Sequence, residues 1–270
     1  MRTFLKQLFF FTKICLALSF VGGLTYYIID KVQEKNNLMD IEEYTPKSTL
    51  VIKETSVIRA KFPFIDVHNH QFDMPVKDLN KLVAEMDSLN MAFMINLSGF
   101  RGLYLRKSLE NIKENAPNRF GLFLNIDFET IDEEDFAQKQ KLLIESAVQA
   151  GVMGLKVYKS LGLTDRDQYG NRIKVNDSRL DPVWMACGEN NIPVLIHSGE
   201  PVSFWHAKDK FNERWLELRQ KPSRYKDPKT NPSFEEVLAE QHEIFRKHPN
   251  TTFINAHLGW MGNDLDRLDD

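Results

Sequence analysis

From residue 62 onward, short apolar runs alternate with windows in which apolar residues recur every three to four positions. The short runs predict six strands, over residues 62–70, 91–97, 120–127, 154–160, 193–198 and 252–258. The windows between them predict helices near 76–89, 103–115, 133–150, 179–190, 233–248 and from 262 onward. In the third window, Phe136, Leu142, Leu143, Ala147 and Ala150 form one apolar face, as in an amphipathic helix.

Strict alternation of strands and helices predicts an α/β fold with a parallel sheet, either doubly wound or closed as a (β/α)8 barrel. No Gly-x-Gly-x-x-Gly turn follows the first strand, so a dinucleotide-binding start is not supported. Polar residues stand instead at the ends of strands one, four, five and six, where barrel enzymes assemble their sites. We therefore predict a (β/α)8 TIM-type barrel with about six of its eight units present. Because two strands are missing, we expect a fragment rather than an unusual open fold.

The first thirty residues differ in kind from the rest. Three basic residues, Arg2, Lys6 and Lys13, precede an apolar run over residues 14–29, which is typical of an export signal. No small-x-small cleavage site ends the run, so residues 1–30 predict an uncleaved signal anchor or transmembrane segment rather than a buried core helix. Residues 31–60 then form a polar linker, and 61–270 the incomplete barrel. The positive-inside tendency places the catalytic domain outside the cytoplasm, on the periplasmic or extracellular side.

Composition narrows the class of protein. The 270 residues carry a net charge of -3, with 42% hydrophobic and 27% charged residues, which is typical of a globular protein. The basic residues are scattered rather than gathered in a stripe, so we exclude a nucleic-acid binder. Only Cys15 and Cys187 occur, which excludes a disulfide framework. Association into a homo-oligomer stays open.

Four histidines end predicted strands. His68 and His70 close the first strand, one residue apart, on the face that also carries Asp66. His197 closes strand five, and His257 closes strand six, where alternation would turn Phe253, Asn255 and His257 toward the barrel axis. We predict His68, His70 and His197 as metal ligands, because three imidazoles leave an open position on a catalytic zinc ion. His257 would orient or protonate the reacting group, or join the ligands; the alternative is four unrelated core histidines.

Lys156 would also face the axis, from the fourth strand. A lysine there is costly unless it meets an anion, so we predict that it binds a substrate carboxylate or carbonyl oxygen. It could instead be carboxylated and bridge a second metal, or extend to the rim. Two long connections, 161–178 and 200–232, are expected to shape the substrate pocket. In the second, Trp205, His206 and Arg214 could stack on and anchor an anionic substrate, or simply pack within the loop.

Four motifs together resemble the amidohydrolase superfamily, specifically its amidohydrolase-2 branch. They are Ile65-Asp-Val-His-Asn-His70, Gly154-Leu-Lys-Val-Tyr158, Ile192-Pro-Val-Leu-Ile-His-Ser-Gly-Glu-Pro201 and Phe253-Ile-Asn-Ala-His-Leu-Gly-Trp260. The resemblance implies a metal-dependent barrel, usually with one zinc or similar divalent ion. It matches His68 and His70 to the strand-one ligand pair, His197 to the strand-five ligand and His257 to the strand-six histidine. The family's aspartate at the end of strand eight has no counterpart in this sequence.

The resemblance implies a metal-dependent hydrolase acting on a C–N or C–O bond of a small polar or anionic substrate. A metal-dependent decarboxylase of an aromatic or unsaturated acid is the alternative within the same branch. A third reading is a non-catalytic, membrane-anchored or decayed barrel, motivated by the two missing strands.

Overall fold

The computed structural model describes residue 19 and residues 21–29, 31–32, 43–53 and 55–269. The chain forms two units, residues 1–56 and 57–270. In the first unit, residues 21–29 are helical and exposed, and residues 44–53 form neither helix nor strand. The rest of the predicted anchor and part of the predicted linker lie outside the described residues. None of the helices among the described residues has the length and hydrophobicity of a membrane span.

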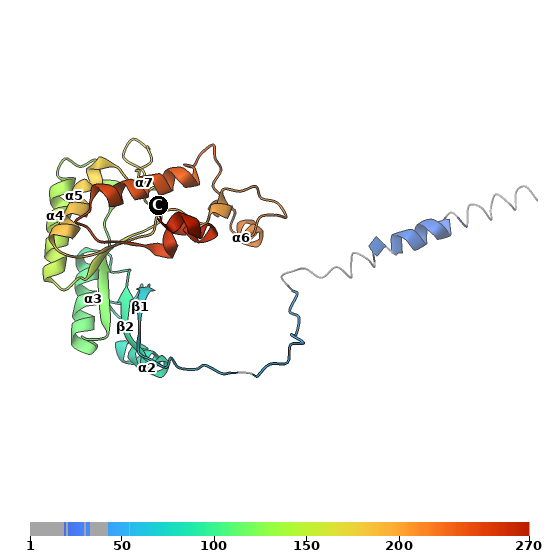
Figure 1. The fold of residues 1–270 in the computed structure, drawn as a ribbon, viewed down its shortest axis with the longest axis horizontal. Coiled ribbons are helices and arrows are strands. Elements are labelled where there is room, and N and C mark those ends of the chain that lie inside the picture. Colours follow the sequence, from blue (N-terminus) through green and yellow to red (C-terminus); the bar gives the residue numbers. More distant parts are fainter. Residues whose placement is uncertain (1–18, 20, 30, 33–42, 54, 270) are drawn as a thin grey trace, which may run out of the picture. The chain divides into compact units, whose positions relative to one another are not determined.

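The second unit is built on one parallel sheet whose six strands lie in sequence order (Figure 1). The strands are β1 Phe64–Asn69, β2 Met91–Asn96, β3 Phe120–Leu124, β4 Gly154–Val157, β5 Val194–Ile196 and β6 Phe253–Asn255. Each falls within a predicted run. The prediction of about six β-α units of a (β/α)8 barrel is therefore confirmed.

Helices follow the strands in turn: α2 Leu79–Leu89, α3 Gly102–Asn115, α4 Phe136–Gln149, α5 Asp181–Glu189, α6 Trp215–Gln220 and α7 Phe234–Lys247. Local chemistry sets their ends. The Asp78 side chain accepts hydrogen bonds from the backbone N–H groups of Asn80 and Lys81 and so begins α2, which ends at the left-handed residue Asn90. The helix expected from residue 262 onward was wrong, because short 3-10 turns occupy that stretch.

Apolar side chains pack on both faces of the sheet. Leu155, Val157, Val194 and Ile196 join the main core on the side covered by helices. On the other face, Leu97, Phe123, Leu195 and Ala256 form a smaller cluster. Lys156 alternates with the outward residues of β4 and lies opposite Leu195 of β5, so it faces the interior of the curled sheet, as predicted.

Strand β6 has the opposite parity to the one predicted. Phe253 packs against Trp184 of α5 and Phe245 of α7, and the Asn255 side chain donates to the Gln241 side chain of α7. Both residues therefore face the helices, and the prediction that they face the axis was wrong. The register explains the difference, because the inward residue Leu195 lies opposite Ile254 rather than Phe253.

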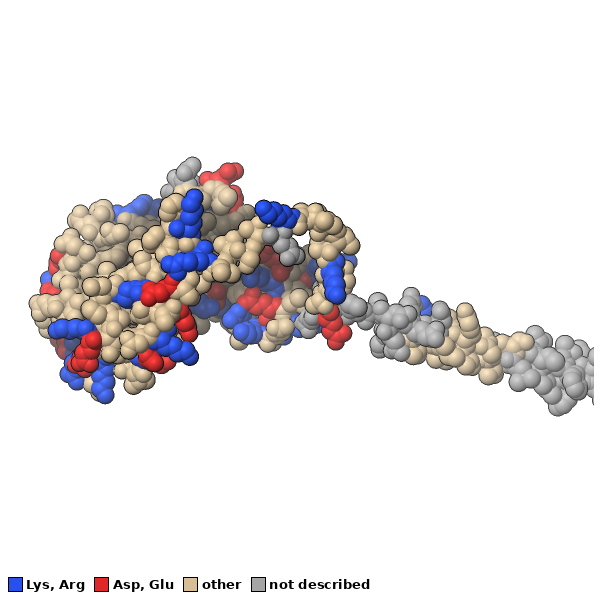
Figure 2. All heavy atoms as spheres, turned by 90° about the horizontal axis from the view of Figure 1, so that it is seen from below, with Lys and Arg blue, Asp and Glu red and all other residues tan. Residues whose placement is uncertain are grey.

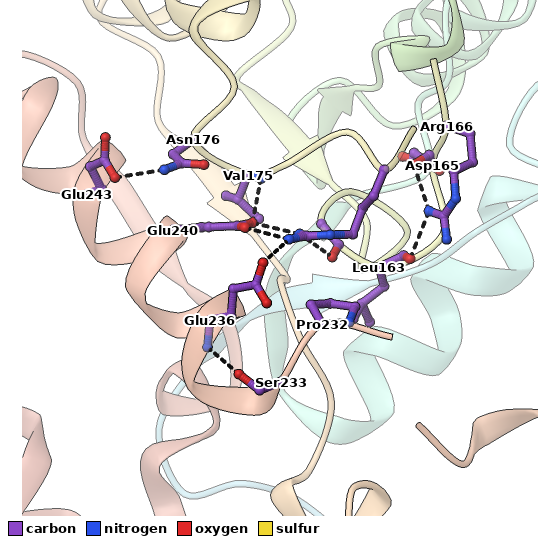
Figure 3. Close-up of polar contacts among 12 residues, drawn as sticks. Leu163, Asp165, Arg166, Val175, Asn176, Pro232, Ser233, Glu236, Glu240 and Glu243 are labelled. Atoms are coloured by element: carbon purple, nitrogen blue, oxygen red, sulfur yellow. Dashed lines mark hydrogen bonds and ion pairs between the residues drawn. The ribbon is translucent and has the colours of Figure 1, made fainter. Parts of the chain in front are cut away.

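The loop over residues 161–178 is held on α7 by hydrogen bonds to glutamate side chains of that helix (Figure 3). The Arg172 guanidinium bonds both carboxylate oxygens of Glu240, at 2.7 and 2.9 Å, and also contacts Glu236. The backbone N–H of Val175 donates to Glu240, and the Asn176 side chain donates to Glu243 at 2.7 Å. Four contacts thus fix the loop to one helix face.

Charges of both signs are mixed on the surface. Figure 2 shows lysine and arginine side chains beside aspartate and glutamate side chains on the face that it draws. The balanced composition of the sequence is thus also visible on this face.

Candidate metal centre

Three histidines converge at the carboxyl ends of the strands. His68 lies in β1, His197 directly follows β5, and His257 lies in the turn after β6. One ligand nitrogen of each lies within 4.8 Å of the others. The ring centroids of His257 lie 4.6 Å from His197 and 5.2 Å from His68. His68 and His197 are half-buried, and His257 is exposed.

The turn that carries His257 is left-handed over four consecutive residues. The φ angles of His257, Leu258, Gly259 and Trp260 are 57°, 53°, 60° and 64°. For residues other than glycine this conformation costs about 1–2 kcal/mol each. At Gly259 a Cβ atom would lie 2.3 Å from the Asn255 side-chain amide nitrogen, so a larger residue there would displace Asn255. The turn brings His257 to the other two histidines although the parity of β6 alone would point it toward the helices.

The imidazoles are held in their neutral form. Burial first, and the nearby Lys156 second, lower the pKa of His197 to about 3 and that of His68 to about 4. Burial also lowers the pKa of His70 and of His257. Nitrogen ligands must be unprotonated to bind a metal, so all four offer lone pairs at neutral pH.

The donor set fits a divalent ion. The His197 ring belongs to the cluster, and its buried Nε2 atom has no hydrogen-bond partner among the residues that the structure describes. A buried polar atom without a partner is costly unless a ligand satisfies it. Imidazole nitrogens suit zinc and similar divalent ions, and three of them leave coordination positions open.

His70 lies beside the three histidines but is engaged differently. Its Nδ1 lies 2.8 Å from the Ser98 hydroxyl, and its ring stacks between Phe72 and Tyr158, at centroid distances of 5.7 and 5.9 Å. Its ring centroid is 5.5 Å from that of His68. The set that the structure brings within 4.8 Å thus contains His257 where the predicted ligand set contains His70.

Lys156 is the most unusual residue of the site. Its side chain is 1% exposed, and its Nζ has no hydrogen-bond partner within the described part of the chain. Burial lowers its pKa to about 8, and its charge lowers the pKa of all four histidines. Lys156 and Tyr158 line a cavity of about 120 Å³ whose wall also includes Asp127 and Asp165.

The three loop residues predicted to bind substrate are engaged elsewhere or exposed. The Trp205 indole N–H donates to the Pro232 carbonyl oxygen at 2.8 Å, and the ring packs on Phe234. Arg214 forms an ion pair with Glu217 at 3.3 Å. His206 is exposed. Their role in binding stays a prediction.

Sequence reasoning missed Glu200. This carboxylate is 5% exposed and forms an ion pair with Lys159 at 2.6 Å. Its charge raises the pKa of His257, against the larger effect of burial, so it lies within electrostatic reach of the histidine cluster. The signal was its place three residues after His197, at the end of a strand that carries a candidate ligand.

A search of curated proteins finds no match to the chain. Among solved structures, it is similar to 2,6-dihydroxybenzoate decarboxylase complexed with 2,6-dihydroxybenzoate, at 13% identity and a TM-score of 0.49, over 76% of this chain and 69% of that one. It is also similar to 5-carboxyvanillate decarboxylase from Novosphingobium aromaticivorans complexed with manganese, at 14% identity and a TM-score of 0.48. This match covers 78% of this chain and 69% of the decarboxylase chain. A third is an amidohydrolase from Mycobacterium avium subsp. paratuberculosis, at 15% identity and a TM-score of 0.42, over 72% and 50%.

The family comparison covers more than half of the sequence. The model of the family described as Amidohydrolase matches residues 109–270, a region that includes Lys156, His197 and His257. The chain therefore belongs to the amidohydrolase family, in its amidohydrolase-2 branch.

Proposed function

We propose that the protein is a metal-dependent hydrolase that cleaves a C–N or C–O bond of a small anionic molecule. His68, His197 and His257 would hold one divalent ion, with zinc as the first candidate. The observation that carries the proposal is the convergence of three neutral imidazoles beside a buried lysine without a partner. The membrane-anchored location predicted from residues 1–30 is kept as a sequence-based proposal.

Each residue of the centre has a distinct part in this proposal. A divalent ion held by these histidines would supply a polarising charge and an activated water for hydrolysis. The imidazoles provide the lone pairs, and Trp260 packs on the rings of His197 and His257, at centroid distances of 5.4 and 4.8 Å, to restrict their motion. The exposed His257 borders solvent, so a substrate reaches the centre from its side.

Lys156 would select the anionic substrate. A buried ammonium group without a partner gains most from an anion that displaces water and accepts its hydrogen bonds. The electrostatic effect of Lys156 on all four histidines supports a position for that anion near the proposed metal centre. A substrate carboxylate beside Lys156 would thus orient the scissile bond at the three histidines.

The test uses purified protein reconstituted with Zn²⁺ and two chromogenic esters, 4-nitrophenyl acetate and the anionic mono-4-nitrophenyl succinate. We expect metal-dependent release of 4-nitrophenolate, faster for the anionic ester, and its loss in His68→Ala and His197→Ala. Lys156→Met should remove the preference for the anionic ester while the metal content stays unchanged.

Other outcomes would replace this proposal. Release of carbon dioxide from 2,6-dihydroxybenzoate without ester hydrolysis would favour the decarboxylase. Stoichiometric Zn²⁺ binding without turnover of any of the three compounds would favour a non-catalytic binding protein. Full activity in His197→Ala would exclude the centre as the site of reaction.

A further inference from the structure

A continuous chain of hydrogen bonds leads away from His70. Its Nδ1 lies 2.8 Å from the Ser98 hydroxyl oxygen, which lies 3.0 Å from the Tyr158 hydroxyl oxygen. The Tyr158 hydroxyl in turn lies 3.3 Å from the backbone carbonyl oxygen of Leu97. Three contacts therefore join four polar groups, and the last of them can only accept.

Further hydrogen bonds hold this hydrogen-bond chain in place. Ser98 is fully buried, and its backbone N–H donates to the Asn96 side-chain oxygen at 2.9 Å. The same oxygen accepts the backbone N–H of Gln71, and the Asn96 amide donates to the Gln71 carbonyl oxygen at 3.0 Å. Asn96 thus fixes the backbone of Ser98 relative to Gln71, the residue that follows His70.

The number of available protons determines which group donates in each of these hydrogen bonds. A serine or tyrosine hydroxyl has one proton to donate. If Tyr158 donates to the Leu97 carbonyl, Ser98 must donate to Tyr158, and the proton of the first contact must come from His70 Nδ1. All three contacts are then hydrogen bonds. In the reverse direction, the tyrosine oxygen and the Leu97 carbonyl would face each other without a proton between them.

We infer that Ser98 and Tyr158 are positioning residues that hold His70 in its Nδ1–H tautomer and leave the lone pair on Nε2. Stacking of the His70 ring between Phe72 and Tyr158, at interplanar angles of 9° and 28°, restricts its rotation. His70 then provides a fourth neutral nitrogen donor beside the three-histidine cluster. This inference deepens the proposed function, since a metal or a proton at the centre can use only the nitrogen that carries the lone pair.

The tautomer can be observed directly. Metal-free protein labelled with ¹⁵N-histidine gives long-range proton–nitrogen correlations that separate the protonated nitrogen from the one with the lone pair; His70→Gln assigns the signals. At neutral pH we expect His70 of the wild type to carry its proton on Nδ1. In Ser98→Ala this preference should be lost. In Tyr158→Phe the Ser98 hydroxyl, freed from its acceptor, should donate to Nδ1 and shift the proton to Nε2.

Tyr104→Phe is the matched control, because its hydroxyl bonds the backbone carbonyl of Phe72 rather than Ser98, and it should leave the tautomer unchanged. Zn²⁺ affinity should fall about 10- to 100-fold in Ser98→Ala, as for other partners of metal-binding histidines. A wild-type proton on Nε2, or an unchanged tautomer in both variants, would overturn the inference. Because the spectra need neither metal nor substrate, they stay informative if the proposed hydrolase activity fails.

Discussion

Two regions of the barrel bury polar groups in opposite ways. Where the loop over residues 161–178 meets α7, the buried Glu240 carboxylate is bonded by Arg172 and by a backbone N–H group. At the carboxyl ends of the strands, which we call the mouth of the sheet, four buried polar atoms have by contrast no hydrogen-bond partner among the described residues. They are Lys156 Nζ, His197 Nε2, Ser198 Oγ and Trp260 Nε1.

The difference distinguishes a structural cluster from the proposed binding site. Buried charges that serve stability are paired and hydrogen-bonded, because an unpaired one is costly. At the mouth, the free-energy cost of polar groups without partners is added to the backbone strain of the left-handed turn at residues 257–260. Polar groups without partners, strained backbone and neutral imidazoles coincide there, as expected of a site prepared for a ligand.

The largest effect should come from removing a histidine of the cluster. His197→Ala removes one of three nitrogen donors, so Zn²⁺ affinity should fall at least about 1,000-fold, more than the 10- to 100-fold typical of an outer partner. Competition with a chromogenic chelator measures it. His206→Ala, an exposed histidine of the neighbouring loop, is the control and should bind Zn²⁺ as the wild type does.

Breaking the paired cluster should destabilise the fold instead. Arg172→Met leaves the Glu240 carboxylate buried with its charge unpaired, and we expect the free energy of unfolding to fall by about 3 kcal/mol. Urea denaturation measures the change. Arg106→Met is the matched control, because the Arg106–Glu110 pair is exposed and its loss should change stability by less than about 1 kcal/mol. Equal losses in the two variants would contradict the distinction.

Lowering the pH should reduce the free energy of unfolding through the histidines at the mouth of the sheet. Folded His68 and His197 have pKa values of about 4 and 3, against 6.5 for the free side chain. Between these values the unfolded chain binds more protons than the folded one, so stability must fall as pH falls below 6.5. We expect a loss of about 2 kcal/mol between pH 6.5 and roughly pH 5 in metal-free protein. In a His68→Gln, His197→Gln variant the dependence should flatten; an unchanged slope would show that these imidazoles are not held neutral.

The smallest expected change in the free energy of unfolding comes from replacing Lys156. Replacing its unpaired ammonium group with an apolar side chain of similar length removes the cost of burial, so Lys156→Met should raise the free energy of unfolding by about 1 kcal/mol. Thermal and urea unfolding of metal-free protein measure it. A destabilised variant would mean that Lys156 has a partner and belongs with the structural cluster.

The sequence predicted the sheet well because each strand and helix has its own hydrophobic period. Strand ends also located His68, His197 and Lys156, since parallel strands bring their carboxyl ends together. Strand ends also predicted that His257 lies with them, but for the wrong reason, because a left-handed turn rather than strand alternation brings it there against local preference. The Ser98 contact of His70 and the Glu200–Lys159 pair join residues 28 and 41 positions apart, which no local pattern reveals.

The central claim is that the three histidines form a metal centre. Anomalous diffraction from crystals grown with Zn²⁺ would test it most directly, because the ion is located without reference to activity. The account predicts one anomalous peak bonded to nitrogen atoms of His68, His197 and His257. No peak there, or one bound only by surface carboxylates, would contradict the account.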